Sequence, residues 1–238
     1  MSKIICLWSC PRNVSTALMY SFGSRRDTQI TDEVLYGYYL SKRNVNHPGK
    51  NEIIENLECN SQKVINEIIL KPKKKVNFHK LMTHFLIDID LEFLNKVTNV
   101  LFIRDPKEII HSYHKVIPNP TIDDIGVKKQ FELFNYLNDT GNKVIILDSK
   151  DLLTDPEKTL NILCEKINIP FDKNMLNWKK GPKKEDGMWA KYWYENVHQS
   201  SCFNIYQIRD IKLDLKNKKL AENCYKYYNI LKENSIKI

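Results

Sequence analysis

Short apolar runs rich in isoleucine and valine constrain the fold of this chain more than any other sequence feature. They occupy residues 4–8, 76–78, 100–103 and 144–147, and a shorter extended segment is predicted at residues 28–31. Continuous apolar runs of this length are typical of strands that are buried on both faces of a parallel sheet. The chain is therefore expected to contain such a sheet.

Segments with helical character separate these strands. They are predicted at residues 15–22, 53–70, 106–116 and 123–138. Strands that alternate with helices imply crossover connections, so the expected fold class is α/β, with a central parallel sheet and helices on both faces. Ligands of such sheets bind beyond the carboxyl ends of the strands, and functional residues are expected in the loops that follow strands.

The pattern changes after the last predicted strand. The Asp-Pro-Glu sequence at residues 155–157 predicts a helix start, because it combines an N-cap residue, a proline and an early acid. Residues 170–203 hold many aromatic and charged side chains but little periodicity, and a helix is predicted at residues 215–231. The length suits one domain over residues 1–238, in which residues 170–210 are expected to form an acceptor site or lid.

The chain is basic, because 37 lysines and arginines exceed 29 aspartates and glutamates, which gives a formal net charge of +8. A polyanionic nucleotide fits this charge, and no aromatic–basic or helix-turn-helix motif indicates a nucleic-acid partner. No apolar run approaches the roughly 20 residues of a membrane helix, and the first eight residues do not resemble a signal peptide. The six cysteines lack metal-ligand spacing, so free thiols and a cytoplasmic location are expected.

A candidate anion site lies in residues 8–16, between the first predicted strand and the first helix. Backbone N–H groups at a helix start bind anions. Ser15 and Thr16 add hydroxyl groups, and Arg12 adds a planar fork of donors suited to phosphate. The alternative is that the two hydroxyl residues only cap a helix. The segment lacks both glycines and the lysine of the nucleotide-binding motif G-x-x-x-x-G-K-S/T, which argues against a metal-dependent kinase.

A second candidate site follows the strand at residues 100–103. Arg104 stands at the strand end, and Asp105 and Pro106 predict a helix start. Ser112 lies seven residues beyond Asp105, about two helical turns, and returns to the same helix face. Arg104 and Ser112 are therefore expected to bind one further phosphate together.

These segments resemble motifs of the superfamily of sulfotransferases that use 3′-phosphoadenosine 5′-phosphosulfate (PAPS). The first loop resembles the 5′-phosphosulfate loop P-K/R-S/T-G-S/T-S/T, with departures at Asn13 and at Val14, where glycine is commoner. Residues 100–113 resemble the 3′-phosphate motif, and residues 148–172 resemble the helix-plus-LPFD signature of bacterial members. Lys183 lies in a segment that faintly resembles the R-K-G segment, with a solvated loop as the alternative. The donor-binding residues implied by this resemblance are Pro11, Arg12, Asn13, Val14, Ser15, Thr16, Arg104, Ser112 and Lys183.

The resemblance implies a P-loop-like three-layer fold and transfer of a sulfuryl group from PAPS to a small acceptor hydroxyl or amine, with PAP as product and no required metal. A similar bacterial and plant subset opens with LWS-x-PRN-x-STALMYSF, as this chain does. Some of its members have aminotransferase-like names, but no residue pattern here indicates pyridoxal phosphate. The alternatives are a metal-dependent P-loop nucleotide kinase and a non-catalytic protein that binds PAP or another nucleotide.

Four residues are the candidates for catalysis. Arg12 is expected to stabilise charge on the leaving phosphate oxygen. Glu33 resembles the general base of some sulfotransferases, with a helix cap as the alternative. His84 is the rival base, and Lys80 precedes it by four residues in a loose likeness to the K-T-H motif of cytosolic sulfotransferases. A structural histidine is the alternative for His84.

Two further expectations concern side chains near these motifs. Cys10 lies in the proposed anion loop just before a helix, where a thiolate would be stabilised, so alkylation is expected to impair donor binding. The aromatic residues at positions 189–194 are expected either to line the acceptor pocket or a lid, or to pack in the core.

Overall fold

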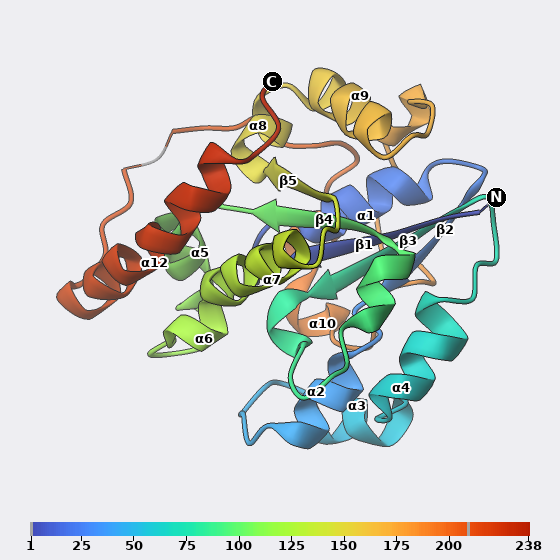
Figure 1. The fold of residues 1–238 in the computed structure, drawn as a ribbon. Coiled ribbons are helices and arrows are strands. Elements are labelled where there is room, and N and C mark those ends of the chain that lie inside the picture. Colours follow the sequence, from blue (N-terminus) through green and yellow to red (C-terminus); the bar gives the residue numbers. More distant parts are fainter. Residues whose placement is uncertain (1, 209) are drawn as a thin grey trace.

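The computed structural model describes residues 2–208 and 210–238 and contains a five-stranded sheet in the order β2-β3-β1-β4-β5. Every neighbouring pair of strands is parallel. Helices pack around this central sheet (Figure 1), so the expected α/β fold class is confirmed. The strands are β1 (Lys3–Ser9), β2 (Thr28–Asp32), β3 (Val76–Met82), β4 (Thr98–Ile103) and β5 (Val144–Asp148).

Twelve α-helices connect and cover the strands of the described chain. In the first half they are α1 (Ser15–Gly23), α2 (Tyr36–Lys42), α3 (Lys50–Asn56), α4 (Ser61–Val64), α5 (Pro106–Tyr113) and α6 (Ile122–Ile125). In the second half they are α7 (Val127–Asp139), α8 (Ser149–Thr154), α9 (Pro156–Lys166), α10 (Ala190–Trp193), α11 (Glu195–His198) and α12 (Leu215–Glu233). Short helical turns of other types are η1 (Ile65–Ile69), η2 (Thr83–Phe85), η3 (Glu92–Lys96) and η4 (Lys173–Leu176).

The sheet separates two apolar cores, because alternate side chains of a strand point to opposite faces. On β1, Cys6 and Trp8 belong to the core that α2, α7 and α12 cover, whereas Ile5 and Leu7 belong to the core beneath α1 and α9. All four side chains are fully buried. The three-layer arrangement expected from the apolar runs follows from this division.

Two helices that the sequence predicts as continuous are split. Over residues 53–70, the chain is extended at Leu57 and a new helix begins after Asn60, whose side chain accepts a hydrogen bond from the Lys63 N–H (3.0 Å). Asparagine favours this N-cap position because its oxygen satisfies a free N–H of the first turn. Over residues 123–138, Gly126 adopts a φ of 78° and separates α6 from α7. Left-handed backbone ends a helix and favours glycine.

Strand β3 is longer than its apolar run predicts. The apolar run covers residues 76–78, but the strand continues to Met82 and includes His79 and Lys80. Both polar side chains are buried, at 2% and 1% exposure. The sequence signal ends early because buried polar residues interrupt an apolar pattern even where the strand continues.

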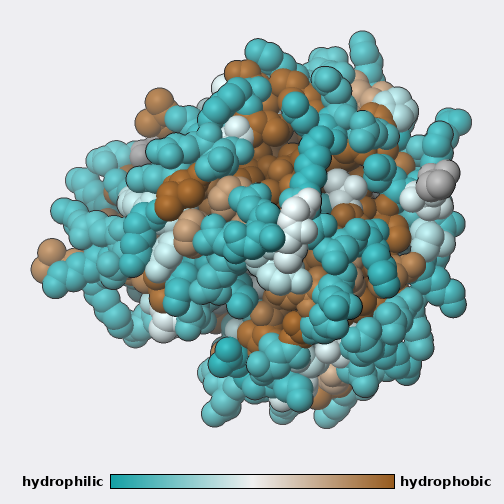
Figure 2. Space-filling model, in the orientation of Figure 1, coloured by the Kyte–Doolittle hydropathy of each residue, from teal (hydrophilic) through white to brown (hydrophobic). Residues whose placement is uncertain are grey.

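Polar side chains cover most of the surface seen in Figure 2, and apolar side chains gather between them. No helix within residues 2–208 or 210–238 combines the length and the apolar character that crossing a bilayer requires. All six cysteines are free thiols, as their spacing predicts.

Candidate functional site

A cavity of about 720 Å³ lies beyond the carboxyl ends of β1, β2, β3 and β4. Segments distant in sequence line it, among them residues 11–17, Arg104 and Ser112, and residues 200–207. Its volume falls within the range of about 300–1,000 Å³ that is typical of small-molecule sites. The carboxyl edge of a parallel sheet is where ligands of α/β folds bind.

The loop between β1 and α1 has an unusual backbone. Arg12 and Val14 are both left-handed, with φ values of 59° and 46°. No side chain caps α1, which starts after Val14. Left-handed backbone costs an L-residue roughly 1–2 kcal/mol, which explains why glycine is commoner at the position of Val14 in similar loops. The uncapped helix start leaves its first N–H groups available to an anion.

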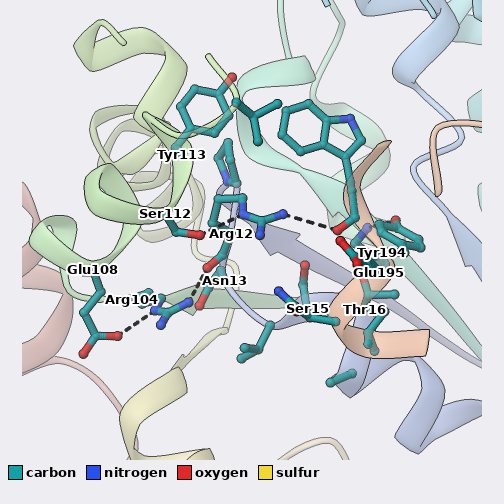
Figure 3. Close-up of a pocket in the computed structure, with 18 of the residues that line it drawn as sticks. Arg12, Asn13, Ser15, Thr16, Arg104, Glu108, Ser112, Tyr113, Tyr194 and Glu195 are labelled. Carbon is teal, nitrogen blue, oxygen red and sulfur yellow. Dashed lines mark hydrogen bonds and ion pairs between the residues drawn. The ribbon is translucent and has the colours of Figure 1, made fainter. Parts of the chain in front are cut away.

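The structure joins the two phosphate motifs that the sequence predicts separately. Arg12 donates from Nε to Ser112 Oγ at 3.0 Å, although the two residues are 100 positions apart (Figure 3). Arg104 donates to the Arg12 carbonyl at 2.5 Å. A second Arg12 nitrogen donates to the Trp193 carbonyl at 3.3 Å. Both motifs and the segment before α11 therefore form one site.

The two guanidinium groups give this end of the cavity a positive charge. Arg104 pairs with Glu108 at 2.8 Å. Within residues 2–208 and 210–238, no carboxylate forms an ion pair with Arg12. Burial, together with the like charge of Arg104, lowers the pKa of Arg12 from its usual value. A bound anion would relieve both effects, so this arrangement favours an anionic ligand.

Asn13 has a structural contact that its place in the motif does not predict. Its side-chain amide is buried and donates to the Phe102 carbonyl at the end of β4. Gln130 donates to the same carbonyl at 2.8 Å and to the Trp8 carbonyl at 3.0 Å. Asn13 thus holds the loop on the sheet through its side-chain nitrogen, while it also lines the cavity.

The candidate base Glu33 and the candidate Lys80 lie side by side. Glu33 follows β2 with a φ of 42°, is 6% exposed and lines the cavity. The Lys80 ammonium lies 2.5 Å from Glu33 Oε1, 2.9 Å from Asp32 Oδ1 and 2.6 Å from the Tyr194 hydroxyl. No sequence motif points to Asp32 as part of the site, and the sequence indicates Tyr194 only as one of the aromatic residues at positions 189–194.

Burial and charge act against each other in this cluster. Burial raises the pKa of Glu33 and the Asp32 carboxylate adds to that effect, while the Lys80 ammonium opposes them; the pKa remains above its usual value. For Lys80, burial disfavours the charged form, but the two carboxylates outweigh it and raise the pKa. The net rise in pKa gives the Glu33 carboxylate a greater affinity for a proton, which is the property that a general base needs.

The rival base His84 also lines the cavity. Burial lowers its pKa to about 3, with a small further contribution from His47. Its ring packs edge-on against Tyr39 and Phe85. A neutral imidazole with so low a pKa accepts a proton weakly, so the structure favours Glu33.

The prediction of a stabilised thiolate at Cys10 is wrong. Its side chain is fully buried, and burial raises its pKa to about 12 despite the nearby Arg104 charge. The loop that follows it lines the cavity, but Cys10 itself belongs to the buried apolar core and does not line the cavity. Removal from water outweighs the electropositive surroundings.

Lys183 lies apart from the other predicted donor-binding residues. It is not among the residues that line the cavity. Its ammonium contacts the Lys179 carbonyl and lies 5.3 Å from the centre of the Tyr20 ring. The structure therefore does not bring Lys183 to the site that contains Arg12 and Arg104.

The aromatic residues of segment 189–194 both line the cavity and pack in the core. Trp189, Tyr192, Trp193 and Tyr194 all line the cavity. Trp189 and Tyr194 are also members of the apolar core, at 2% and 5% exposure, whereas Tyr192 is 41% exposed. The segment thus forms one wall of the cavity and anchors that wall in the core.

Comparisons with known proteins agree with this architecture. The family model described as a sulfotransferase domain matches residues 2–234. Two relatives from Arabidopsis thaliana, named branched-chain-amino-acid aminotransferase-like proteins 2 and 1, are 37% and 35% identical over 232 residues. The matches cover 97% of this chain but only 41% and 42% of those relatives, so the chain spans about two fifths of their length.

Solved sulfotransferase structures share the fold. A sulfotransferase domain from the Synechococcus PCC 7002 olefin synthase has a TM-score of 0.57 at 18% identity, over 94% of this chain and 95% of that chain. Mouse sulfotransferase SULT7A1 complexed with PAP has a TM-score of 0.52 at 13% identity, over 97% and 88% of the two chains. The family match over nearly the whole described chain, on a P-loop-like α/β fold, leads to one conclusion: this chain belongs to the sulfotransferase domain family.

Proposed function

We propose that this chain transfers a sulfuryl group from PAPS to the hydroxyl or amine of a small acceptor. The proposal rests on the surroundings of the Arg12 guanidinium. Among the described residues it has no carboxylate partner, and its Nε donates a hydrogen bond to Ser112 Oγ at 3.0 Å. This contact joins the 5′-phosphosulfate motif to the 3′-phosphate motif at one cavity. A nucleotide that carries phosphates at both its 5′ and 3′ positions matches such a pair of sites.

The donor groups of the cavity fit this ligand. Arg12 and the uncapped start of α1 would hold the 5′-phosphosulfate, with the hydroxyl groups of Ser15 and Thr16. Arg104 and Ser112 would hold the 3′-phosphate. When bound, the donor supplies an activated sulfuryl group whose leaving group is a nucleotide phosphate.

Glu33, which lines the same cavity, then supplies proton transfer. Glu33 accepts the proton of the acceptor group as its oxygen or nitrogen forms a bond to sulfur. The bond between sulfur and the bridging oxygen breaks at the same time, and its electron pair leaves with the phosphate. Arg12 stabilises the charge that builds on that oxygen. The products are the sulfated acceptor, PAP and a proton held by Glu33.

Calorimetry with PAP in the absence of metal tests the donor site. We expect micromolar binding by the wild type and loss of binding in the double variant Arg104→Ala with Ser112→Ala. The double variant Arg43→Ala with Ser41→Ala is the matched control, because it removes the same two residue types outside the cavity. Folded wild type that binds ATP with magnesium but not PAP would refute the proposal and favour a nucleotide kinase.

Turnover separates an enzyme from a protein that only binds the nucleotide. PAP release from PAPS is to be measured with a panel of small alcohols, phenols and amines, for the wild type and for Glu33→Gln. We expect at least one acceptor to stimulate PAP release in the wild type, with a loss of about 10²–10⁴-fold in the variant. PAP binding without release for any acceptor, or release unchanged in Glu33→Gln, would contradict the assigned reaction or base.

A further inference from the structure

Lys80 is at the centre of a buried polar cluster that the proposed reaction uses only in part. Its side chain is 1% exposed, and its three N–H donors match three oxygen acceptors, on Asp32, Glu33 and Tyr194. The Tyr194 hydroxyl in turn donates to Asp32, at 2.8 Å to Oδ2. It also accepts a hydrogen bond from the indole N–H of Trp189 at 3.2 Å. The buried groups of this cluster are therefore hydrogen-bonded to one another.

Asp32 differs from Glu33 in where its side chain lies. Asp32 pairs with Lys80 in the parallel register of β2 and β3, so the two backbones place these side chains as neighbours. The Asp32 side chain is 0% exposed and does not line the cavity, whereas Glu33 does. The Oδ2 atom of Asp32 accepts a hydrogen bond from the Gly187 N–H at 3.2 Å. Asp32 can therefore affect a ligand only through its neighbours.

We infer that Asp32 is a positioning residue for Glu33: it binds the Lys80 ammonium and the Tyr194 hydroxyl, so that Glu33 shares Lys80 instead of forming a closed ion pair with it. This inference rests on the proposed function, in which Glu33 takes the acceptor's proton. It also explains why residues 187–194 pack against the end of β2. Asp32 fixes that segment through the Gly187 N–H and the Tyr194 hydroxyl.

Charge balance is the physical reason. A buried carboxylate paired with one ammonium is held ionised and is a weak base. Two carboxylates that share one ammonium leave one negative charge in excess, so the cluster gains stability when it binds a proton. That proton arrives at Glu33, because only Glu33 of the two carboxylates reaches the cavity.

Among residues 2–208 and 210–238, phenols also interact electrostatically with Glu33. Burial raises the pKa of Tyr36 and Tyr113, and Glu33 itself contributes in both cases, so neither supplies a charge near neutral pH. In the described part of the chain, titratable groups that interact with Glu33 come from β2, β3, α2, α5 and the segment before α11; they are Asp32, Lys80, Tyr36, Tyr113 and Tyr194.

The test is the titration of Glu33 by NMR in protein labelled with ¹³C at the glutamate carboxyl carbon. The Glu33 resonance is assigned by its loss in Glu33→Gln. In Asp32→Asn, Lys80 has one carboxylate partner left, so we expect the midpoint of Glu33 to fall by about one pH unit. In Lys80→Met the midpoint rises, because the ammonium that opposes protonation is gone. Opposite shifts in the two variants are the signature of a shared ammonium.

Asp148→Asn is the matched control for this titration. Asp148 is also buried, and it accepts from the Tyr228 hydroxyl at 2.7 Å and pairs with Lys232 at 3.1 Å. It does not line the cavity. The control thus removes a buried carboxylate with the same kinds of partner, and the Glu33 midpoint is expected to stay at its wild-type value.

Two outcomes overturn the inference. One is a Glu33 midpoint that is unchanged in folded Asp32→Asn. The other needs no variant: a wild-type midpoint below the ordinary value of about 4.3 would mean that Lys80 pairs with Glu33 alone. The titration uses the protein without substrate, so it stands even if the chain transfers no sulfuryl group. Failure of the proposed function is seen separately, as absent PAP binding.

Discussion

Removal of the Lys80 ammonium is the perturbation whose magnitude the structure predicts best. Lys80→Met keeps an unbranched side chain of similar length but leaves Asp32 and Glu33 without their cation. The side chains of Lys80, Asp32 and Glu33 are 1%, 0% and 8% exposed. Loss of one partner from a buried ion pair costs about 3–5 kcal/mol, because the remaining charge is left uncompensated. That loss is a large part of the free energy of unfolding of a typical domain, which is about 5–15 kcal/mol.

The pH dependence of this loss follows from the pKa of Glu33, which is already raised in the wild type. Without the ammonium, it rises further above the value in the unfolded chain. A group with a raised pKa in the folded state contributes stability below its unfolded pKa, and that contribution is lost as the pH rises through the folded pKa. The variant should therefore lose less stability near pH 5, where Glu33 binds a proton, than at pH 8, while the loss of the Asp32 partner remains at both pH values.

Urea unfolding at pH 5 and pH 8, followed by circular dichroism, measures this difference. The control is Lys232→Met, which removes an ammonium that also contacts two carboxylates, Asp148 and Asp151, but is 35% exposed. Water screens Lys232 and Asp151, and buried Asp148 keeps the hydrogen bond from the Tyr228 hydroxyl at 2.7 Å. We therefore expect a smaller loss than in Lys80→Met. Equal losses in the two variants, or a Lys80→Met loss that grows as the pH falls, would refute the reasoning.

Two further predictions concern the loop and the cavity wall. When the native protein is treated with a thiol reagent at neutral pH, we expect exposed Cys202 to be alkylated and buried Cys10 to be protected. Peptide mass spectrometry measures the labelling of each cysteine. Rapid labelling of Cys10 would contradict its burial. A Cβ at Gly187 would lie 2.1 Å from the Trp189 ring, so Gly187→Ala should shift the Trp189 indole N–H resonance and cost about 1–3 kcal/mol. Gly141→Ala is the control, because no atom lies within 4 Å of a Cβ added there, and it should leave the Trp189 resonance in place. Equal spectra for the two variants would exclude the close contact between Gly187 and the Trp189 ring.

Part of the candidate site could be found from short segments alone. The Arg12 loop and the Arg104–Ser112 helix are local patterns, in which a strand end, a helix start and donor side chains follow one another within about ten residues. Asp105 caps α5 by accepting from the Lys107 N–H at 2.8 Å, as its sequence signal indicates. Capping is a property of neighbouring residues, so it can be predicted without the rest of the chain.

Other features depended on contacts that no local pattern contains. The hydrogen bond between Tyr194 and Asp32 joins residues 162 positions apart. Glu33 and Lys80 can therefore be predicted separately from the sequence, but the Tyr194–Asp32 hydrogen bond that belongs to the same cluster cannot. The error at Cys10 has the same origin, because its pKa depends on burial by distant elements more than on its place before a helix.

The layers of the fold and the sheet edge at which the candidate site lies follow from local sequence patterns. Apolar runs, helix caps and strand–loop–helix order act within a few residues, and backbone stereochemistry turns them into a parallel sheet. Which side chains share a partner and which are withdrawn from the cavity could not be predicted before the distant segments were packed together. Those properties depend on removal from water and on charges that approach within about 3 Å from distant strands and helices, as they do around Lys80.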